Sequence, residues 1–230
     1  MNLPNLQKIA FLYGIFGNIQ FVIVSTIAMF FYPGGTAINP LTSGYSFWAN
    51  FFSDLGRTKT YSDALNTVSY VLFSILFLVW GLAIIALFIG LPSIITESRK
   101  GKWISIVGGI FAIICGIAGI GVVLTPADIV PFAHFLWAAT LYLAMMFTEF
   151  FIAFAIFLTK RFPKKYAIFS LISAILLLIY IITMISGPLP MTQEWLEIYV
   201  VGQKMIFYGF IAAVGATAYG AWKLSGKSAA

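Results

Sequence analysis

Two ionisable residues stand in strongly apolar stretches of this chain, the acid Glu149 and the base Lys204. No charged residue follows Glu149 before Lys160, and none follows Lys204 before Lys223. Ionisable side chains are costly at membrane depth, so they usually turn inward to a partner, a cavity or a transport pathway. Each could therefore pair with a polar group, bind a ligand or exchange a proton inside a helical bundle.

Further polar residues lie near the predicted outer ends of the apolar segments. His134, the only histidine, begins the fourth such segment. Lys204 lies about 12 Å below the outer end of the sixth segment, at about 1.5 Å per helical residue. Its long stem could carry its amine toward the carboxylates of Asp54 and Asp128. The predicted polar site consists of Ser53, Asp54, Asn66, Asp128, His134, Gln203 and Lys204.

Two kinds of chemistry fit this set. An Asp54–His134 pair could act as a general base toward water or a lipid hydroxyl, whereas a buried pair that only sets helix register is the structural alternative. One histidine and one cysteine exclude a conventional zinc site, and the HExxH and GxSxG motifs are absent. We therefore expect no metal and no cofactor, and the sequence does not decide whether the protein is an enzyme.

Glu149 is predicted to lie apart from the other polar residues. At the same rise per residue it is about 22 Å below His134, too deep for a direct ion pair with Lys204. It serves either as a buried hydrogen-bonding group or as part of a proton or ion path. Its expected partners are Asn18, Gln20 and Tyr180.

Composition indicates a polytopic membrane protein. Hydrophobic residues make up 61% of the 230 residues and charged residues 9%, against about half and about a quarter in soluble proteins. The net charge of +6 comes from basic residues in short loops, which favours a role in membrane topology over nucleic-acid binding. Cys115 is the only cysteine, so no intramolecular disulfide forms.

Six segments are long and apolar enough to cross a hydrocarbon core about 30 Å thick, which takes about 20 helical residues. The first is too long for the apolar part of a signal peptide, so we expect it to remain in the mature protein. The sequence thus predicts an all-α, six-helix membrane bundle that forms one domain over residues 1–230. The predicted spans are residues 9–32, 66–91, 103–124, 134–158, 166–185 and 196–222.

Basic residues predict the orientation of the bundle. With the N-terminus inside, ten of the 13 lysines and arginines lie on the inner side, and only Arg57 and Lys59 lie in outer loops. The positive-inside rule therefore places both termini in the cytoplasm of a multi-pass cell-membrane protein. The ten inner residues are Lys8, Arg99, Lys100, Lys102, Lys160, Arg161, Lys164, Lys165, Lys223 and Lys227.

The outer loop over residues 33–65 is the one long connection, and it is rich in aromatic residues. Aromatic side chains favour the membrane interface, so we expect a short helix in this loop that lies over or between the outer ends of the bundle. Farther along, Thr192 is the predicted N-cap of the last span. The aromatic residues of the loop are Phe47, Trp48, Phe51 and Phe52.

Small residues recur every fourth position in two spans, which lets helix backbones approach closely. This pattern fits a compact bundle and equally fits a dimer face. The residues are Gly108, Ala112 and Gly116 in the third span, and Gly209, Ala213 and Thr217 in the sixth.

With these residues in view, the chain resembles a prokaryotic six-helix family known as domain of unknown function 998, and its layout is similar to the DRAM/Sfk family. The resemblance implies a six-helix bundle with a polar site on its outer side and no established activity. Two positions depart from the expected pattern: Lys204 replaces an arginine, and Phe135 follows the histidine in place of a glycine. The landmarks are Asn50, Ser53-Asp54-Leu55-Gly56, Asn66, the loop that leads to His134, and Gly202-Gln203-Lys204.

These observations lead to a first hypothesis and three alternatives. The first is a bundle that binds a membrane lipid or a small polar ligand at its outer end, with a hydrophobic crevice that reaches the polar site from the lipid. The alternatives are a lipid-modifying or hydrolytic enzyme that uses His134 and Asp54, an accessory subunit or homo-oligomer that packs through the small-residue faces, and, with less support, a transporter based on Glu149.

Overall fold

The computed structural model describes residues 3–188 and 191–226, and within these ranges the chain is helical with no β-strand. Each of the six long helices is apolar and long enough to cross a membrane, which fits an integral membrane protein. They are α1 (Leu3–Phe30), α2 (Thr67–Gly90), α3 (Arg99–Leu124), α4 (Pro131–Phe157), α5 (Lys164–Ser186) and α6 (Gln193–Gly226). Two short 3-10 helices, η1 (Phe52–Gly56) and η2 (Leu91–Ser93), lie in the connections.

All six predicted spans are present, with boundaries that differ by a few residues. At its start α3 is capped by Ser98, whose hydroxyl accepts a hydrogen bond from the Gly101 amide at 3.0 Å. The predicted N-cap of α6 is also present, because the Trp195 amide donates to the Thr192 hydroxyl at 3.4 Å. With 34 residues, α6 is about 51 Å long and exceeds the hydrocarbon thickness. Of the basic residues used for topology, Lys227 lies outside the described residues.

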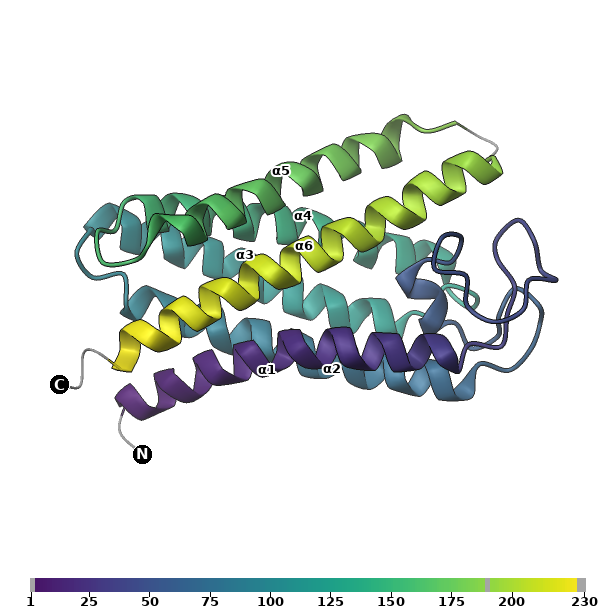
Figure 1. Ribbon diagram of the computed structural model, residues 1–230, viewed down its shortest axis with the longest axis horizontal. Coiled ribbons are helices and arrows are strands. Elements are labelled where there is room, and N and C mark those ends of the chain that lie inside the picture. Colours follow the sequence, from purple (N-terminus) through teal and green to yellow (C-terminus); the bar gives the residue numbers. More distant parts are fainter. Residues whose placement is uncertain (1–2, 189–190, 227–230) are drawn as a thin grey trace.

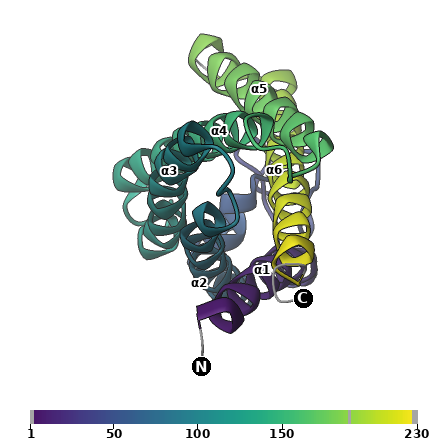
Figure 2. The ribbon, with the colours of Figure 1, turned by 90° about the vertical axis from the view of Figure 1, so that its left-hand side faces the viewer.

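The helices are arranged around a common interior, seen end-on in Figure 2. Neighbours in sequence pack against each other, α6 returns to pack against α1, and α5 packs on α4 and α6. The start of α1 and the end of α6 lie at the same end of the bundle (Figure 1), as an even number of crossings requires. The loop between α1 and α2 lies at the opposite end.

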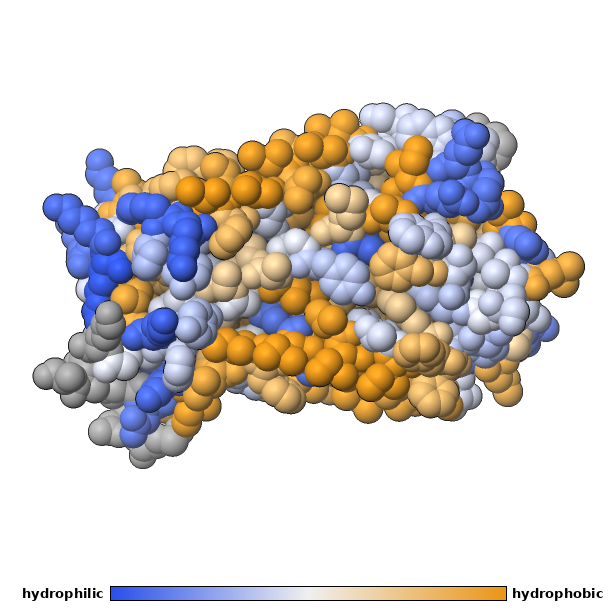
Figure 3. Space-filling view, viewed as in Figure 1, coloured by the Kyte–Doolittle hydropathy of each residue, from blue (hydrophilic) through white to orange (hydrophobic). Residues whose placement is uncertain are grey.

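The surface in Figure 3 carries a broad apolar region along the helices, with hydrophilic residues gathered mainly toward the two ends. Many of the exposed side chains in this region are isoleucines, leucines and phenylalanines, such as Ile19, Ile110 and Phe169. A surface of this kind is unfavourable in water and favourable in a bilayer. The space-filling view therefore agrees with the assignment of six membrane-spanning helices.

The predicted short helix of the outer loop is η1. It packs between the helices at that end of the bundle rather than over them. Its Phe52 is 2% exposed and packs against Phe21 of α1 at 5.9 Å and Phe207 of α6 at 5.5 Å between ring centroids. The aromatic cluster continues inward through Phe77 and Trp80 of α2. This cluster holds η1 between helices that are distant in sequence.

The small residues of the third span pack inside the molecule. Gly108, Ala112 and Gly116 are all buried. A Cβ atom added at Gly116 would lie 2.7 Å from the carbonyl oxygen of Gly81, so α2 and α3 approach closely there. In α6, Ala213 and Thr217 are buried too, and only the position of Gly209 faces open space. These stripes hold the bundle together and leave no outward small-residue face on α3.

Candidate functional site

The outer loop is organised around Asn50, which is completely buried. Its side-chain amide donates to the carbonyl oxygen of Gly35 at 2.9 Å and to Oδ2 of Asp54 at 3.0 Å. Its side-chain oxygen accepts from the Ser46 amide at 2.9 Å. One residue therefore joins three separate points of the loop, and its backbone carbonyl provides a fourth connection, described below.

Asp54 shapes the start of η1. Its Oδ2 accepts from the Phe51 amide at 2.9 Å, in addition to Asn50, as a carboxylate does in the first turn of a helix. Burial raises the pKa of Asp54, and the hydrogen bonds from Asn50 and Phe51 together with the charge of Arg57 only partly offset this effect. The carboxylate is thus occupied with local structure.

Lys204 lies beneath the loop, where its buried amine donates to the backbone carbonyl of Asn50 at 2.6 Å. The amine also faces the rings of Phe47 at 4.9 Å, Tyr45 at 5.4 Å and Phe52 at 5.7 Å. Such cation–π contacts stabilise a desolvated ammonium. The amine therefore extends toward the loop that carries Asp54, but it bonds to a backbone carbonyl among three aromatic rings and forms no ion pair with Asp54 or Asp128 within the described part of the chain.

Gln203, the neighbour of Lys204, connects η1 to α4. Its Oε1 accepts from the Phe52 amide at 2.7 Å, and its Nε2 donates to the Tyr142 hydroxyl at 2.7 Å. Two consecutive residues of α6 therefore hold the same loop from below.

Asn66 and Asp128 hold the far side of the loop. The Asn66 amide donates to the carbonyl oxygens of Leu55 at 3.1 Å and Arg57 at 2.9 Å. Asp128 accepts from the Thr58 amide at 3.0 Å, from the Thr58 hydroxyl at 2.5 Å and from the Lys59 amide at 2.9 Å. Partial burial raises the pKa of Asp128, but these hydrogen bonds lower it more, so the net shift is downward.

His134 lies in the first turn of α4 and caps the end of α3. Its Nδ1 is 2.7 Å from the carbonyl oxygen of Thr125, and since a carbonyl only accepts, this nitrogen carries the hydrogen. Asp54 and His134 are not hydrogen-bonded to each other. The geometry required for an Asp54–His134 general base is therefore missing.

A crevice of about 470 Å³ lies between α4, α5 and the η1 end of the loop. Most of its lining is apolar, and the polar side chains in it are Ser53, His134, Tyr142, Tyr180 and Gln203. Phe135 and Ile185 on its wall are 61% and 78% exposed, so the crevice is open at the apolar surface of the bundle. The first hypothesis predicted a hydrophobic crevice at the polar site, and this one reaches Ser53, His134 and Gln203 of that site but not Asp54 or Lys204.

A second, smaller cavity lies behind the crevice. It measures about 20 Å³ and shares four polar side chains with the crevice, Ser53, His134, Tyr142 and Gln203. This volume suffices for one water molecule, and the lining supplies polar partners for it. Four polar side chains thus line both the apolar crevice and a water-sized cavity.

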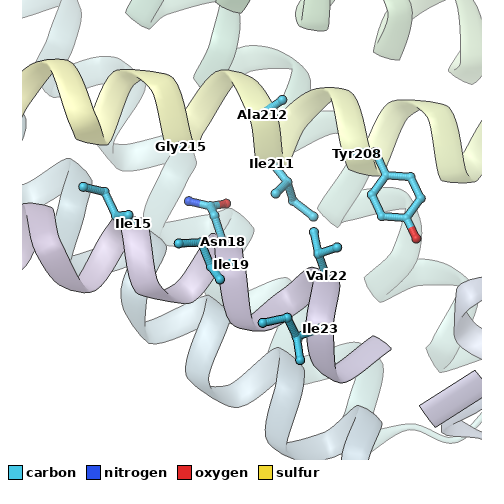
Figure 4. Close-up of a pocket in the computed structure, with 9 residues that line it drawn as sticks. All are labelled: Ile15, Asn18, Ile19, Val22, Ile23, Tyr208, Ile211, Ala212 and Gly215. Carbon is cyan, nitrogen blue, oxygen red and sulfur yellow. The ribbon is translucent and has the colours of Figure 1, made fainter. Parts of the chain in front are cut away.

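A third hollow, the groove between α1 and α6, differs in character (Figure 4). Its volume is about 520 Å³, and its walls are mainly isoleucines, valine and small residues. Asn18 lies in it, with its amide donated to the Gly14 carbonyl of the same helix at 2.8 Å. Since the groove lacks the cluster of polar side chains found in the crevice, we take the crevice as the candidate site.

Glu149 is 1% exposed and is separate from this site. Its neighbours are Ser170 of α5 and Cys115 of α3. The expected partners Asn18 and Gln20 bond instead to backbone carbonyls of Gly14 and Leu76. The prediction of those two partners is therefore wrong. Within residues 3–188 and 191–226 the Tyr180 hydroxyl makes no hydrogen bond to Glu149 either, and Glu149 does not line the crevice.

Sequence reasoning placed Ser53, His134 and Gln203 in the site, and all three line the crevice. Four other residues were predicted for the site, and they hold the loop without lining the crevice. These are Asp54, Asn66, Asp128 and Lys204. It missed Tyr142, which had no signal beyond being an aromatic residue in an apolar span. It used Asn50 only as a motif residue, although an amide four positions before Asp54 could have marked the loop's central contact.

Comparison with known proteins adds no further assignment: no protein-family model, no curated protein and no solved structure matches this chain. The resemblance to domain of unknown function 998 therefore remains a prediction from short motifs.

Proposed function

We propose that this integral membrane protein binds a membrane lipid, with an acyl chain in the crevice between α4 and α5. The single observation that carries the proposal is the coincidence of an open apolar crevice with the polar side chains of Ser53, His134 and Gln203. Its volume of about 470 Å³ falls within the range of about 300–1,000 Å³ that is typical of small-molecule sites.

The shape of the crevice also supports an elongated ligand. Its lining on α4 extends from Pro131 to Leu143, which corresponds to about 18 Å along the helix axis. An acyl chain can occupy this length, while the polar groups of η1 and α6 hold its ester or hydroxyl end.

We further infer that the crevice faces the outer leaflet of the cell membrane, with both termini in the cytoplasm. Basic residues gather at the end of the bundle where α1 begins and α6 ends, which supports this orientation under the positive-inside rule. Membrane lipids are accordingly the partners we propose.

The alternatives have less support. A hydrolase based on Asp54 and His134 lacks the hydrogen bond between them, and the carboxylate is already used in η1. An accessory subunit was motivated by outward small-residue faces, but the face on α3 is buried within the molecule.

A crevice-filling substitution tests the proposal. Ala139 is half-buried in the crevice wall, so Ala139→Trp should fill the chain-binding space, and native mass spectrometry of gently extracted protein should show loss of bound lipid. Ala212→Trp is the matched control, because Ala212 lines the α1–α6 groove instead. Retention of lipid by Ala139→Trp, or equal loss in both variants, would contradict the proposal. Ala139→Phe provides a smaller filling residue if the tryptophan variant does not fold.

A further inference from the structure

We propose that the crevice selects an uncharged lipid, one whose polar end carries hydroxyl or ester groups, such as a diacylglycerol, over a lipid with an anionic phosphate. This inference rests on the proposed function and names the class of lipid that the site takes. Its basis is that no Lys, Arg, Asp or Glu lines the crevice.

The cations of the outer half of the molecule are all engaged elsewhere. Lys204 donates to the Asn50 carbonyl and is enclosed by aromatic rings. Arg57 stacks over the Tyr61 ring at 4.0 Å and donates to the Lys59 carbonyl at 3.1 Å. Lys59 forms an ion pair with Asp63 at 3.0 Å. Recruiting any of them to a phosphate would break an existing contact.

The loss of hydration of an anionic headgroup that entered this site would therefore be poorly compensated. Taking a charge out of water is costly unless an opposite charge or several hydrogen-bond donors replace the lost hydration. The walls at the mouth offer apolar side chains such as Phe135, Met184 and Ile185 instead. An uncharged glycerol or ester group avoids this cost, since it needs only hydrogen bonds.

The hydrogen-bonding groups on the lining suit such a group. The Ser53 hydroxyl has no partner within residues 3–188 and 191–226, so it can donate or accept. The Tyr142 oxygen accepts the Gln203 amide, which leaves its own hydroxyl hydrogen available as a donor. The water-sized cavity that these residues also line allows a water molecule to bridge polar groups that do not meet directly.

A competition between lipids with identical chains tests the inference. Protein stripped of lipid is incubated in detergent with equimolar dioleoylglycerol and dioleoylphosphatidic acid, and the bound masses are measured by native mass spectrometry. We expect dioleoylglycerol to be bound at least tenfold in excess. The variant Ser53→Ala should reduce its binding several-fold, while Ile185→Arg, which places a cation at the mouth, should raise binding of the phosphatidic acid.

The outcomes separate the two proposals. If both lipids bind equally to the unmodified protein and Ala139→Trp abolishes both, the crevice binds lipid but the inference of charge selection is wrong. If neither lipid binds, or if Ala139→Trp changes nothing, the proposed function fails and the inference fails with it. A preference for dioleoylglycerol that disappears in Ala139→Trp supports both.

Discussion

Asp54 and Asp128 anchor the same outer loop, yet their environments shift their pKa values in opposite directions. Burial raises the pKa of Asp54, whereas for Asp128 the bonds from Thr58 and Lys59 outweigh partial burial and lower the pKa. In the unfolded chain both carboxyls titrate near pKa 3.9. As pH rises, the folded protein therefore keeps the proton of Asp54 to a higher pH than the unfolded chain does. It loses the proton of Asp128 at a lower pH than the unfolded chain does.

These shifts predict opposite pH dependences of stability. The contribution of Asp54 is greatest below about pH 4 and falls as pH rises through its raised pKa, whereas that of Asp128 is present above about pH 4 and is lost as pH falls through its lowered pKa. Thermal unfolding in detergent should show this when each protein is compared with the unmodified chain. The difference in melting temperature between the unmodified chain and Asp54→Asn should shrink as pH rises. The corresponding difference for Asp128→Asn should shrink as pH falls. Parallel trends in the two comparisons would contradict this assignment.

At the level of single residues, the sequence identified which polar groups matter better than it identified their partners. Lys204 and Gln203 were expected at the outer polar site, and both hold η1. The partner of Lys204 is a backbone carbonyl. Every residue carries such a group, so no side-chain pattern distinguishes it in advance. The partners of Glu149 were unpredictable for a related reason. They depend on how each neighbouring helix is rotated about its own axis, and sequence periodicity alone does not set that rotation.

Among the elements, the six spans were predictable because membrane thickness demands a minimum apolar length. The short helix in the outer loop was also expected from its aromatic residues, but its depth was not. Phe52 enters a cluster with Phe21 and Phe207. These rings lie far apart in sequence, and only the assembled bundle brings them together.

Two helical glycines, one at a close helix contact and one facing open space, provide a matched test of how the elements pack. Alanine is more favourable than glycine in a helix by about 1 kcal/mol. At Gly116 this gain should be outweighed, because the new Cβ would lie 2.7 Å from the Gly81 carbonyl oxygen and from Ile85. At Gly209 no atom lies within 4 Å of an added Cβ. We expect a lower melting temperature in detergent for Gly116→Ala and an unchanged or higher one for Gly209→Ala. The reverse order would argue against the close contact of α2 and α3.

For the whole molecule, the proposed orientation can be tested with a thiol reagent that does not cross membranes. The native Cys115 is fully buried, so the unmodified chain should give little background. Leu41 in the outer loop is 90% exposed, and Leu41→Cys should be labelled on intact cells. Lys100→Cys, at the opposite end in α3, should be labelled only after permeabilisation. Labelling of Lys100→Cys on intact cells would place the termini outside.

The arrangement of α6 beneath the outer loop also constrains how the protein is made. Phe52 and Gln203 are 151 positions apart, and Asn50 and Lys204 are 154 positions apart. At about 5–20 residues per second, the ribosome needs roughly 8 to 30 s to supply the helix that holds the loop. In the proposed orientation, the loop crosses the membrane before α6 is available to hold it. A helix made late therefore completes a loop made early, and in that orientation a nascent chain halted before α6 would present an unfinished loop to extracytoplasmic proteases.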